Sequence, residues 1–240
     1  MKIGIVQPAS IESGVRLTEL ALRDNANLVL LPEKWVRTID QVPLSEFQKL
    51  AKKYTAVIIP GAFEDGVSVV SPIINGDGKI VGIAKKIHLF EREKERLIAG
   101  DKLVVFSYRG IKFGIVICYD MDFPEIPRFM FLKGVEIILV PSKVDIEGIR
   151  MWRDYLRARV LENRIAIVNA NAIDPPEFPG MSIALQPIKF GKYVDVKIIS
   201  ELGTNEGYVV VDIDPLSYLH LRSERIREYR EFEIHELGNI

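Results

Sequence analysis

One side chain of this sequence stands out for its reactivity. Cys118 is the only cysteine among 240 residues, and it directly follows the apolar run 112–117. Asp122 and Glu125, which come next, have the spacing of a helix capping box. A thiol just before a helix N-terminus feels the positive end of the helix dipole, which favours the nucleophilic thiolate. The sequence therefore predicts covalent catalysis by Cys118, with a buried cysteine that only packs as the alternative.

Two further reactive side chains follow predicted strands. Glu33 comes after the apolar run 27–31 and Pro32, and a proline cannot extend a central strand ladder. Lys86 follows the predicted strand 80–85. In open α/β sheets, chemistry gathers beyond the carboxyl ends of the strands. We therefore expect a carboxylate, an amine and a thiol at one site, although a glutamate or a lysine in such a place is also often a solvated loop residue.

The composition excludes several other classes of protein. With 48% hydrophobic residues and a formal net charge of −1, the chain can bury a large core and has no basic excess for nucleic acid. No apolar run reaches the roughly 20 residues of a membrane helix, and the N-terminal run is too short for a signal peptide. Because a lone cysteine fits a reducing compartment, we predict a cytoplasmic protein without membrane or nucleic-acid partners. Neither the three histidines nor any glycine-rich motif has the spacing of a metal or nucleotide site, so no metal ion or cofactor is predicted.

Alternating strand and helix patterns place the chain in the α/β class. The predicted helices are 11–24, 44–54, 124–133 and 149–163. Besides the runs named above, the predicted strands are 56–63, 67–74, 80–85, 103–108, 165–170, 182–185 and 208–213. Many of these strands are continuously apolar, which indicates sheets that are covered on both faces. We predict two sheets stacked between helical layers.

A faint internal duplication accompanies this pattern. Residues 2–6 resemble 112–116, and residues 27–33 resemble 136–142. The spacing also agrees, because 28 positions separate Gly4 from Pro32 and 27 separate Gly114 from Pro141. Each half therefore begins with a strand, a helix and a parallel strand. Chance similarity between apolar strands is the alternative.

In four blocks the chain resembles the nitrilase superfamily of carbon–nitrogen hydrolases. Residues 30–33 are similar to the glutamate block of that family, and residues 85–90 to its lysine block. Residues 114–125 are similar to its cysteine block, and residues 159–164 to the helix end that follows it. The resemblance implies a four-layer α-β-β-α sandwich with two mixed sheets and pseudo-twofold halves. It also implies a single hydrolase domain over residues 1–240, with a C-terminal arm at about 220–240, and a homodimer or higher homo-oligomer.

The resemblance implies a catalytic triad of Glu33, Lys86 and Cys118. Cysteine would attack the carbonyl carbon of a small-molecule amide, glutamate would act as general base, and lysine would face the oxyanion. Glu93 falls at the family's supporting glutamate, and the backbone N–H of Tyr119 is expected to be a second oxyanion donor. The same triad could instead cleave an N-carbamoyl amine or a nitrile.

Three residues are candidates for substrate contacts. Trp35 lies close to Glu33 in the sequence and could line the pocket, with a tryptophan that only packs as the alternative, and Met121 lies close to Cys118. Lys143 follows a predicted strand and could bind a substrate carboxylate, as in an ω-amidase, although a solvated lysine is the alternative. Two other functions stay open: a cysteine hydrolase with His88 as its base, and a non-catalytic binding protein on the same fold.

Overall fold

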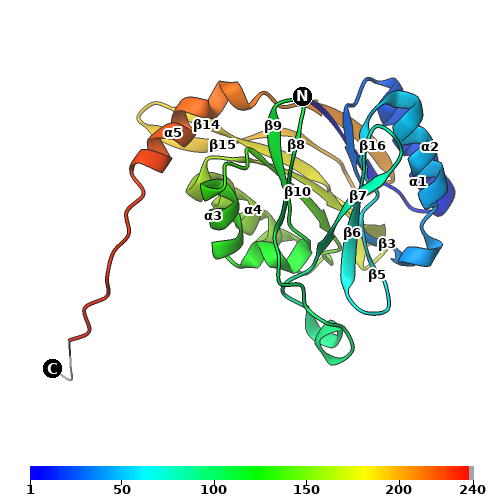
Figure 1. The fold of residues 1–240 in the computed structure, drawn as a ribbon, viewed down its shortest axis with the longest axis horizontal. Helices are drawn as coiled ribbons and strands as arrows, with labels where there is room; N and C mark the ends of the chain where they lie inside the picture. The colour runs from blue at the N-terminus through cyan, green and yellow to red at the C-terminus, as the bar shows by residue number, and fades with distance from the viewer. Residues whose placement is uncertain (238–240) are drawn as a thin grey trace.

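Two large β-sheets lie face to face between layers of helices (Figure 1). The computed structural model describes residues 1–237. The strands of the first sheet are β1 (Lys2–Gln7), β2 (Leu28–Leu30), β3 (Glu33–Thr38), β4 (Val57–Ile59), β5 (Ala62–Glu64), β6 (Val69–Ile74), β7 (Ile80–Lys85) and β16 (Gly207–Asp212). The strands of the second sheet are β8 (Val104–Tyr108), β9 (Ile111–Ile115), β10 (Ile137–Ser142), β11 (Ala166–Asn171), β14 (Ile183–Phe190) and β15 (Tyr193–Glu201). A small third sheet pairs β12 (Ile173–Asp174) with β13 (Phe178–Pro179).

Helices cover the outer face of each large sheet. The α-helices are α1 (Ile11–Arg23), α2 (Leu44–Tyr54), α3 (Glu125–Leu132), α4 (Ile149–Asn163) and α5 (Leu219–Arg227). The 3-10 helices are η1 (Ile39–Gln41), η2 (Glu91–Glu95), η3 (Cys118–Asp122) and η4 (Pro215–Tyr218). Figure 1 shows α1 and α2 beside the first sheet and α3 and α4 beside the second. The predicted four-layer α-β-β-α sandwich is therefore confirmed.

Three apolar cores hold the four layers together. Leu17 of α1 and Phe47 of α2 belong to the core under the first sheet. Ile5 of β1 and Leu139 of β10 meet in the core between the sheets. The third core, between the second sheet and its helices, includes Leu156 of α4. Because apolar side chains emerge on both faces of the central strands, the continuous Ile, Val and Leu runs of the sequence are explained.

The two large sheets repeat one pattern of strand pairing. In the first sheet, β16 is antiparallel to β1. Strands β1, β2 and β4 run parallel to one another, and β6 and β7 complete an antiparallel edge. In the second, β8, β9, β10, β11, β14 and β15 are paired in the same sequence of directions. The pseudo-twofold halves predicted from the sequence are therefore present in the topology.

Matching glycines let each half bring its first helix close to the sheet. A Cβ on Gly4 of β1 would lie 2.9 Å from the Cβ of Ala21 in α1. A Cβ on Gly114 of β9 would collide with the Sδ of Met130 in α3. Any other residue at these positions would force the helix or its side chain away from the strand. The repeated glycine in the sequence thus reports a repeated helix–sheet contact.

Two strands differ from their predicted form. The segment 56–63 is split into β4 and β5 at Pro60 and Gly61, and Gly61 has a φ of +114°. The segment 182–185 extends to Phe190 and forms a hairpin with β15, in which exposed polar residues obscure the strand pattern.

The predicted capping box before α3 is wrong. Pro124 occupies the N-cap position of α3, and no side chain accepts a capping hydrogen bond there. Cys118 instead opens η3, the separate 3-10 turn that lies between β9 and α3. The turn places the thiol beyond the end of β9 without aiming the α3 N-terminus at it.

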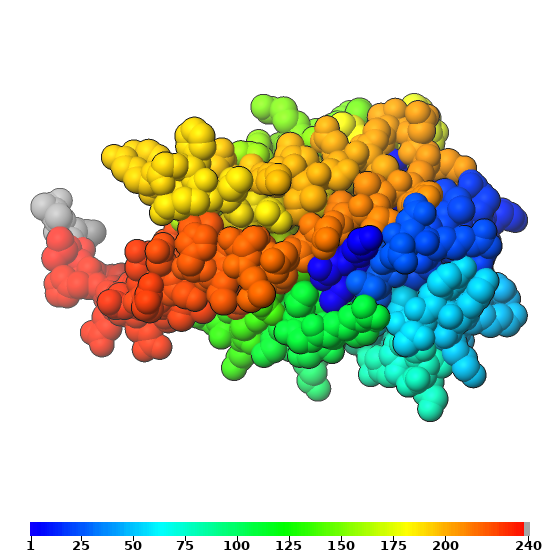
Figure 2. All heavy atoms as spheres, turned by 90° about the horizontal axis from the view of Figure 1, so that it is seen from above, coloured from blue at the N-terminus to red at the C-terminus, as the bar shows by residue number. Residues whose placement is uncertain are grey.

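The C-terminal segment leaves the body of the molecule. After α5 the chain up to Leu237 runs away from the sandwich (Figure 1), with Phe232 and Ile234 exposed. Figure 2 shows the orange-to-red C-terminal residues at one end of the molecule and the blue and cyan N-terminal residues at the other. Residues 238–240 of the predicted arm lie outside the described residues. Within residues 1–237, no helix has both the length and the apolar character required to cross a bilayer.

Candidate active site

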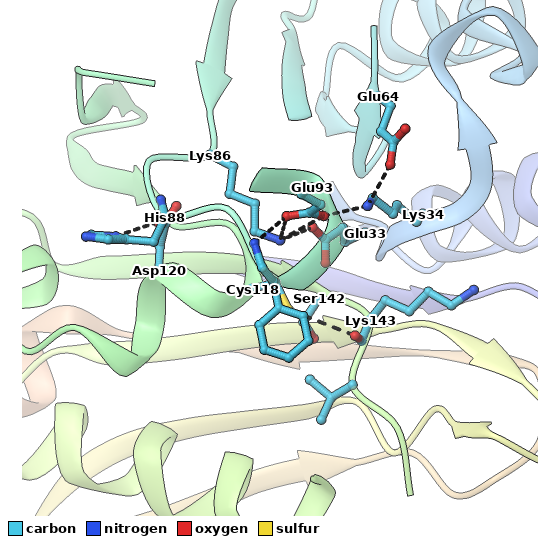
Figure 3. A network of polar contacts seen from close by, with 12 residues as sticks. Glu33, Lys34, Glu64, Lys86, His88, Glu93, Cys118, Asp120, Ser142 and Lys143 are labelled. Carbon is cyan, nitrogen blue, oxygen red and sulfur yellow. Dashed lines mark hydrogen bonds and ion pairs between the residues drawn. The ribbon is translucent and has the colours of Figure 1, made fainter. Parts of the chain in front are cut away.

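Side chains from both sheets meet at one cavity. Glu33, Lys86 and Cys118 all line a cavity of about 500 Å³. Glu33 begins β3, Lys86 follows β7, and Cys118 begins η3 after β9. Figure 3 shows the carboxylate and the ammonium pointing toward one another close to the sulfur. Groups that are 85 positions apart in the sequence, Glu33 and Cys118, therefore share one small space.

Lys86 is the centre of a buried ionic cluster. Its Nζ lies 2.9 Å from Oε1 of Glu33 and 3.0 Å from Oε2 of Glu93, and only 1% of the residue is exposed. Burial by itself would lower the pKa of the Lys86 ammonium, but the negative charges of Glu33 and Glu93, and that of Cys118 whenever its thiol is ionised, raise it above its usual value. The cavity therefore favours the ammonium form of Lys86.

Cys118 is held in an unusual backbone conformation. Its φ of +45° lies in the left-handed region that non-glycine residues rarely adopt. Its Sγ lies 4.0 Å from the carbonyl oxygen of Lys143, and 9% of the residue is exposed. A strained residue on a cavity wall is a common feature of functional sites.

The surroundings of Cys118 favour its protonated thiol. Burial, reinforced by the negative charge of Glu33, raises the pKa of Cys118 well above its usual value, while Lys86 opposes the rise. The prediction that a helix dipole favours the thiolate is therefore wrong, because Cys118 begins the separate turn η3 and burial and the charge of Glu33 outweigh any opposing influence on its pKa. Attack by this sulfur requires a base, and Glu33 is a carboxylate beside it.

The ionic cluster continues beyond the residues that the sequence singled out. Lys34 forms an ion pair with Glu93, and its Nζ lies 2.8 Å from Oε1 of Glu64. Arg96 also pairs with Glu64 and is the main reason that the pKa of Glu64 falls to about 2. Lys34 and Glu64 were not predicted. The only sequence signal for Lys34 is that it directly follows Glu33.

Asp120 connects the loop of Lys86 to the turn of Cys118. Its carboxylate accepts hydrogen bonds from the backbone N–H groups of Ile87 (3.2 Å) and His88 (2.7 Å). The Nδ1 of His88 lies 2.9 Å from the same carboxylate, and the imidazole stacks on Phe123. His88 does not line the cavity (Figure 3), so a mechanism with His88 as the base disagrees with this geometry.

Arg159 of α4 holds the other side of the turn. Its Nε donates to the carbonyl oxygen of Met121 (2.9 Å), and its Nη2 donates to that of Asp122 (2.7 Å). The side chain is almost fully buried. The arginine block that the sequence showed therefore acts on the backbone that follows Cys118.

The remaining predicted residues have different places. Tyr119 and Lys143 line the cavity, whereas Trp35 and Met121 do not. Trp35 donates to the carbonyl oxygen of Pro60 and packs in the core under the first sheet, because the left-handed Lys34 breaks the alternation of β3. Met121 is fully buried under α4. Both side chains therefore pack in apolar cores, which is the alternative that the sequence left open for Trp35, and their predicted contact with substrate gains no support from the cavity.

Several lining residues had no sequence signal. They include Asp145, Tyr155, Glu177 and Phe178. They lie in loops, on the surface of α4 or in the two-residue strand β13, where neither periodicity nor a short motif marks a residue as part of a cavity. Together with the ionic cluster they form a site with a thiol, a carboxylate that can take its proton, and a fixed ammonium beside both. This arrangement suits acyl transfer through a covalent intermediate.

Comparisons with known proteins agree with this chemistry. The sequence model described as carbon-nitrogen hydrolase matches residues 7–219. A 2-oxoglutaramate amidase of Bacillus subtilis (strain 168) is 29% identical over 211 residues, which is 79% of each chain. An ω-amidase of Saccharomyces cerevisiae is 25% identical over 245 residues, covering 86% of this chain and 82% of its own.

Solved structures show the same fold. The crystal structure of Nit3 from Saccharomyces cerevisiae, a member of the nitrilase superfamily, superposes with a TM-score of 0.80 at 23% identity, over 93% of each chain. An amidase from Nesterenkonia sp. superposes with a TM-score of 0.74 at 23% identity, over 95% of each chain.

Proposed function

The chain belongs to the carbon–nitrogen hydrolase family of the nitrilase superfamily, and from that premise we propose that it hydrolyses a small-molecule amide with Cys118 as nucleophile. One observation carries the assignment of residues: the contact of Lys86 with Glu33 at 2.9 Å on the wall that also holds Cys118. Glu33 is the general base, and Lys86 is the cation that faces the developing oxyanion. The relatives named as amidases favour an amide over a nitrile or an N-carbamoyl amine.

The first half of the reaction forms a thioester. Sγ of Cys118 attacks the carbonyl carbon while Glu33 takes the thiol proton, and the carbonyl electron pair moves onto oxygen. Lys86 and the backbone N–H of Tyr119 stabilise this oxyanion. When the carbonyl re-forms, the C–N bond breaks and the nitrogen takes the proton from Glu33. Ammonia or an amine leaves, and the acyl group stays on sulfur.

The second half releases the acid. Glu33 takes a proton from water, and the resulting hydroxide attacks the thioester carbon. The C–S bond then breaks, the acid leaves, and sulfur takes back the proton from Glu33. The sum is amide plus water to carboxylic acid plus ammonia, with the protein unchanged. The same carboxylate serves both halves, which a base on one side of the sulfur can do.

The magnitudes require all three groups. A free thiol has a pKa of about 8.5, and burial makes this one harder to ionise, so a base is essential. A positioned base contributes about 10²–10⁴ in rate and an oxyanion donor about 10²–10³. Together they approach the lower range of enzymatic rate enhancements. In a glutamate-to-glutamine mutant of the Nesterenkonia amidase, the acetamide moiety of fluoroacetamide adds covalently at the active-site cysteine, which supports the same role for Cys118.

The test is a panel of amides, N-carbamoyl amines and nitriles assayed for ammonia release. We expect turnover of at least one amide and a mass increase on Cys118 that matches the acyl group when the reaction is quenched in acid. Cys118→Ala should abolish both while the circular dichroism spectrum stays unchanged. Ammonia release by Cys118→Ala at the original rate would overturn the mechanism, and no release from any compound would favour a binding protein.

Two parts of the proposal concern the protein's context. We propose a homodimer, which the exposed apolar residues Phe232 and Ile234 of the C-terminal segment support. Sedimentation equilibrium tests it, and a monomer at micromolar concentration would contradict it. We also propose a cytoplasmic location, which the lone unpaired Cys118 supports.

A further inference from the structure

The charges on the cavity wall are not balanced. Deep in the cavity, Lys86 and Lys34 are paired with glutamates in the ionic cluster, and near the mouth Lys143 is paired with Asp174 at 3.4 Å. Four further carboxylates line the same cavity: Glu91, Asp122, Asp145 and Glu177. Within the described residues 1–237, none of these four is in an ion pair. The cavity lining therefore holds more carboxylates than cations, and only partial compensation comes from Arg159, whose charge acts on Asp122.

These carboxylates come from four separate segments. Glu91 lies in the loop after Lys86, and Asp122 ends the turn that Cys118 begins. Asp145 lies between β10 and α4, where its Oδ1 accepts a hydrogen bond from the backbone N–H of Gly148 at 2.7 Å. Glu177 lies in the short connection between β12 and β13. The negative charge thus surrounds the mouth instead of belonging to one acidic loop.

Aromatic rings line the same part of the cavity. They belong to Phe90, Tyr119, Tyr155 and Phe178. One of them already holds an ammonium, because the Nζ of Lys143 lies 4.3 Å from the ring centre of Phe178. Ring faces and carboxylates together are the usual environment for an organic cation. Lys143 shows that this wall accepts an ammonium group.

Lys143 itself is badly placed to receive a substrate carboxylate. Its side chain leads away from Cys118 toward Asp174, while its carbonyl oxygen faces the sulfur (Figure 3). A carboxylate at the outer end of a substrate would have to displace Asp174 and enter among four like charges. Like-charge contacts reject a ligand more effectively than neutral contacts do.

We propose that the preferred substrate is an amide whose end remote from the scissile carbonyl carries a protonated amine. This inference rests on the proposed function and names the substrate class of that site. The amide carbonyl lies at Cys118 and Lys86, and the ammonium group lies among Asp122, Glu177 and the aromatic rings. The field of the carboxylates also attracts such a cation from solution, and salt weakens that attraction.

Three amides with the same polymethylene chain test the inference. δ-Aminovaleramide ends in an ammonium, hexanamide has a methyl group in that place, and adipamate has a carboxylate. We expect kcat/KM to decrease in that order, by about ten-fold or more at each step and chiefly through KM. The preference for the ammonium should shrink in about 0.5 M salt. At about 1 M salt, charges are already screened within a few ångströms, so half that concentration weakens the attraction strongly.

Hexanamide separates the two levels of the proposal. Turnover of hexanamide without preference for δ-aminovaleramide overturns the substrate class and leaves the hydrolase intact. Equal or better turnover of adipamate overturns it as well. If none of the three compounds nor any other amide releases ammonia, the proposed function fails, and the substrate class fails with it.

Substitutions connect the preference to the cavity mouth. Glu177→Gln and Asp122→Asn should each reduce the ratio of kcat/KM for δ-aminovaleramide over hexanamide by about three-fold or more. The matched control is Glu147→Gln, an exposed carboxylate in the loop of Asp145 that does not line the cavity. This control should leave the ratio unchanged. An equal loss of preference in Glu147→Gln would mean that general surface charge, and not the cavity, selects the substrate.

Discussion

Corresponding strand ends of the two halves have different tasks. Glu33 follows Pro32 in the first half, and Ser142 follows Pro141 at the matching position of the second. Glu33 lines the cavity and contacts Lys86. Ser142 is fully buried, donates to Oδ1 of Asn171 and accepts from Nδ2 of Asn169. One position carries a reactive group, and its counterpart secures neighbouring strands.

The first strands of the halves show the reverse assignment. Counted from the matching glycines, Cys118 beyond β9 corresponds to Pro8 beyond β1. Next to Pro8, the buried Gln7 binds Ser182 and the carbonyl oxygens of Gly203 and Asn205. Here the second half carries the reactive group and the first half carries the structural one.

This difference shows that the repeated fold provides matching positions at the strand ends but does not determine whether a reactive or a structural residue occupies them. The first half provides Glu33 and Lys86 and the second provides Cys118, and these residues meet because the sheets lie face to face. Lys86 reaches the same place from the loop after β7. A site assembled in this way needs both halves, since neither one contains a base and a nucleophile together.

The largest effect should separate Glu33 from its counterpart. Glu33→Gln should lower kcat by about 10²–10⁴, because a glutamine cannot take the thiol proton. Ser142→Ala should keep kcat within about ten-fold of the parent and lower the free energy of unfolding by about 1–3 kcal/mol, since Asn169 and Asn171 lose a partner. Ammonia release and urea unfolding measure the two quantities. Equal losses of kcat in both variants would break the contrast.

The lysines that follow these positions give a second matched pair. Lys34→Met should lower the free energy of unfolding by about 3 kcal/mol, because the buried carboxylates of Glu64 and Glu93 lose a shared cation. Lys143→Met should cost less than about 1 kcal/mol, since its partner Asp174 is largely exposed. Urea unfolding of both variants checks this. A stability loss that is the same for both would mean that the ionic cluster of the first half contributes nothing special.

Acid should act on the cluster of the first half. The pKa of Glu64 is about 2 in the folded protein against 4.5 ordinarily, so the unfolded chain binds its proton first as the pH falls. The stabilisation by Glu64 is then complete above about pH 4.5 and disappears as the pH approaches 2. The difference in unfolding free energy between the parent and Glu64→Gln should therefore be constant from neutral pH to about pH 5 and shrink below it. A difference that does not change with pH would contradict the assignment.

The matching glycines should give the smallest contrast between the two halves. Gly4→Ala should destabilise the protein by about 1–3 kcal/mol, because its new Cβ meets the Cβ of Ala21, which cannot move without α1. Gly114→Ala should cost less, since the Sδ of Met130 belongs to a flexible side chain that can turn aside. Thermal unfolding of the two variants gives the order. The reverse order would show that the two helix contacts are not as the geometry describes them.

Much of the frame could be predicted from the sequence. Helices α2 and α4 and strand β7 begin and end at the predicted residues, and for α2 a strong apolar periodicity covers the whole length. The exposed hairpin strand β15 was not predicted, since it alternates weakly and depends on its partner β14. The break between β4 and β5 was missed because an apolar run does not show where Gly61 reverses the backbone.

The substrate contacts could not be predicted in the same way. Trp35 is close to Glu33 in the sequence, yet the left-handed Lys34 turns it into the core. Asp122 and Glu177 are 55 positions apart and look like ordinary surface acids in the sequence. Nearness in sequence is thus a poor guide to a cavity whose walls come from several loops.

The sequence by itself determined the layers, the duplication and the three residues proposed to be reactive, because apolar periodicity and short motifs are local properties. Only the tertiary structure decided that the cavity favours the ammonium of Lys86 and the thiol of Cys118, and that Lys34 and Glu64 complete the ionic cluster. Those properties depend on burial and on charges that lie a few ångströms apart in space and far apart along the chain. Electrostatic energy follows distance in space, and a sequence does not contain that distance.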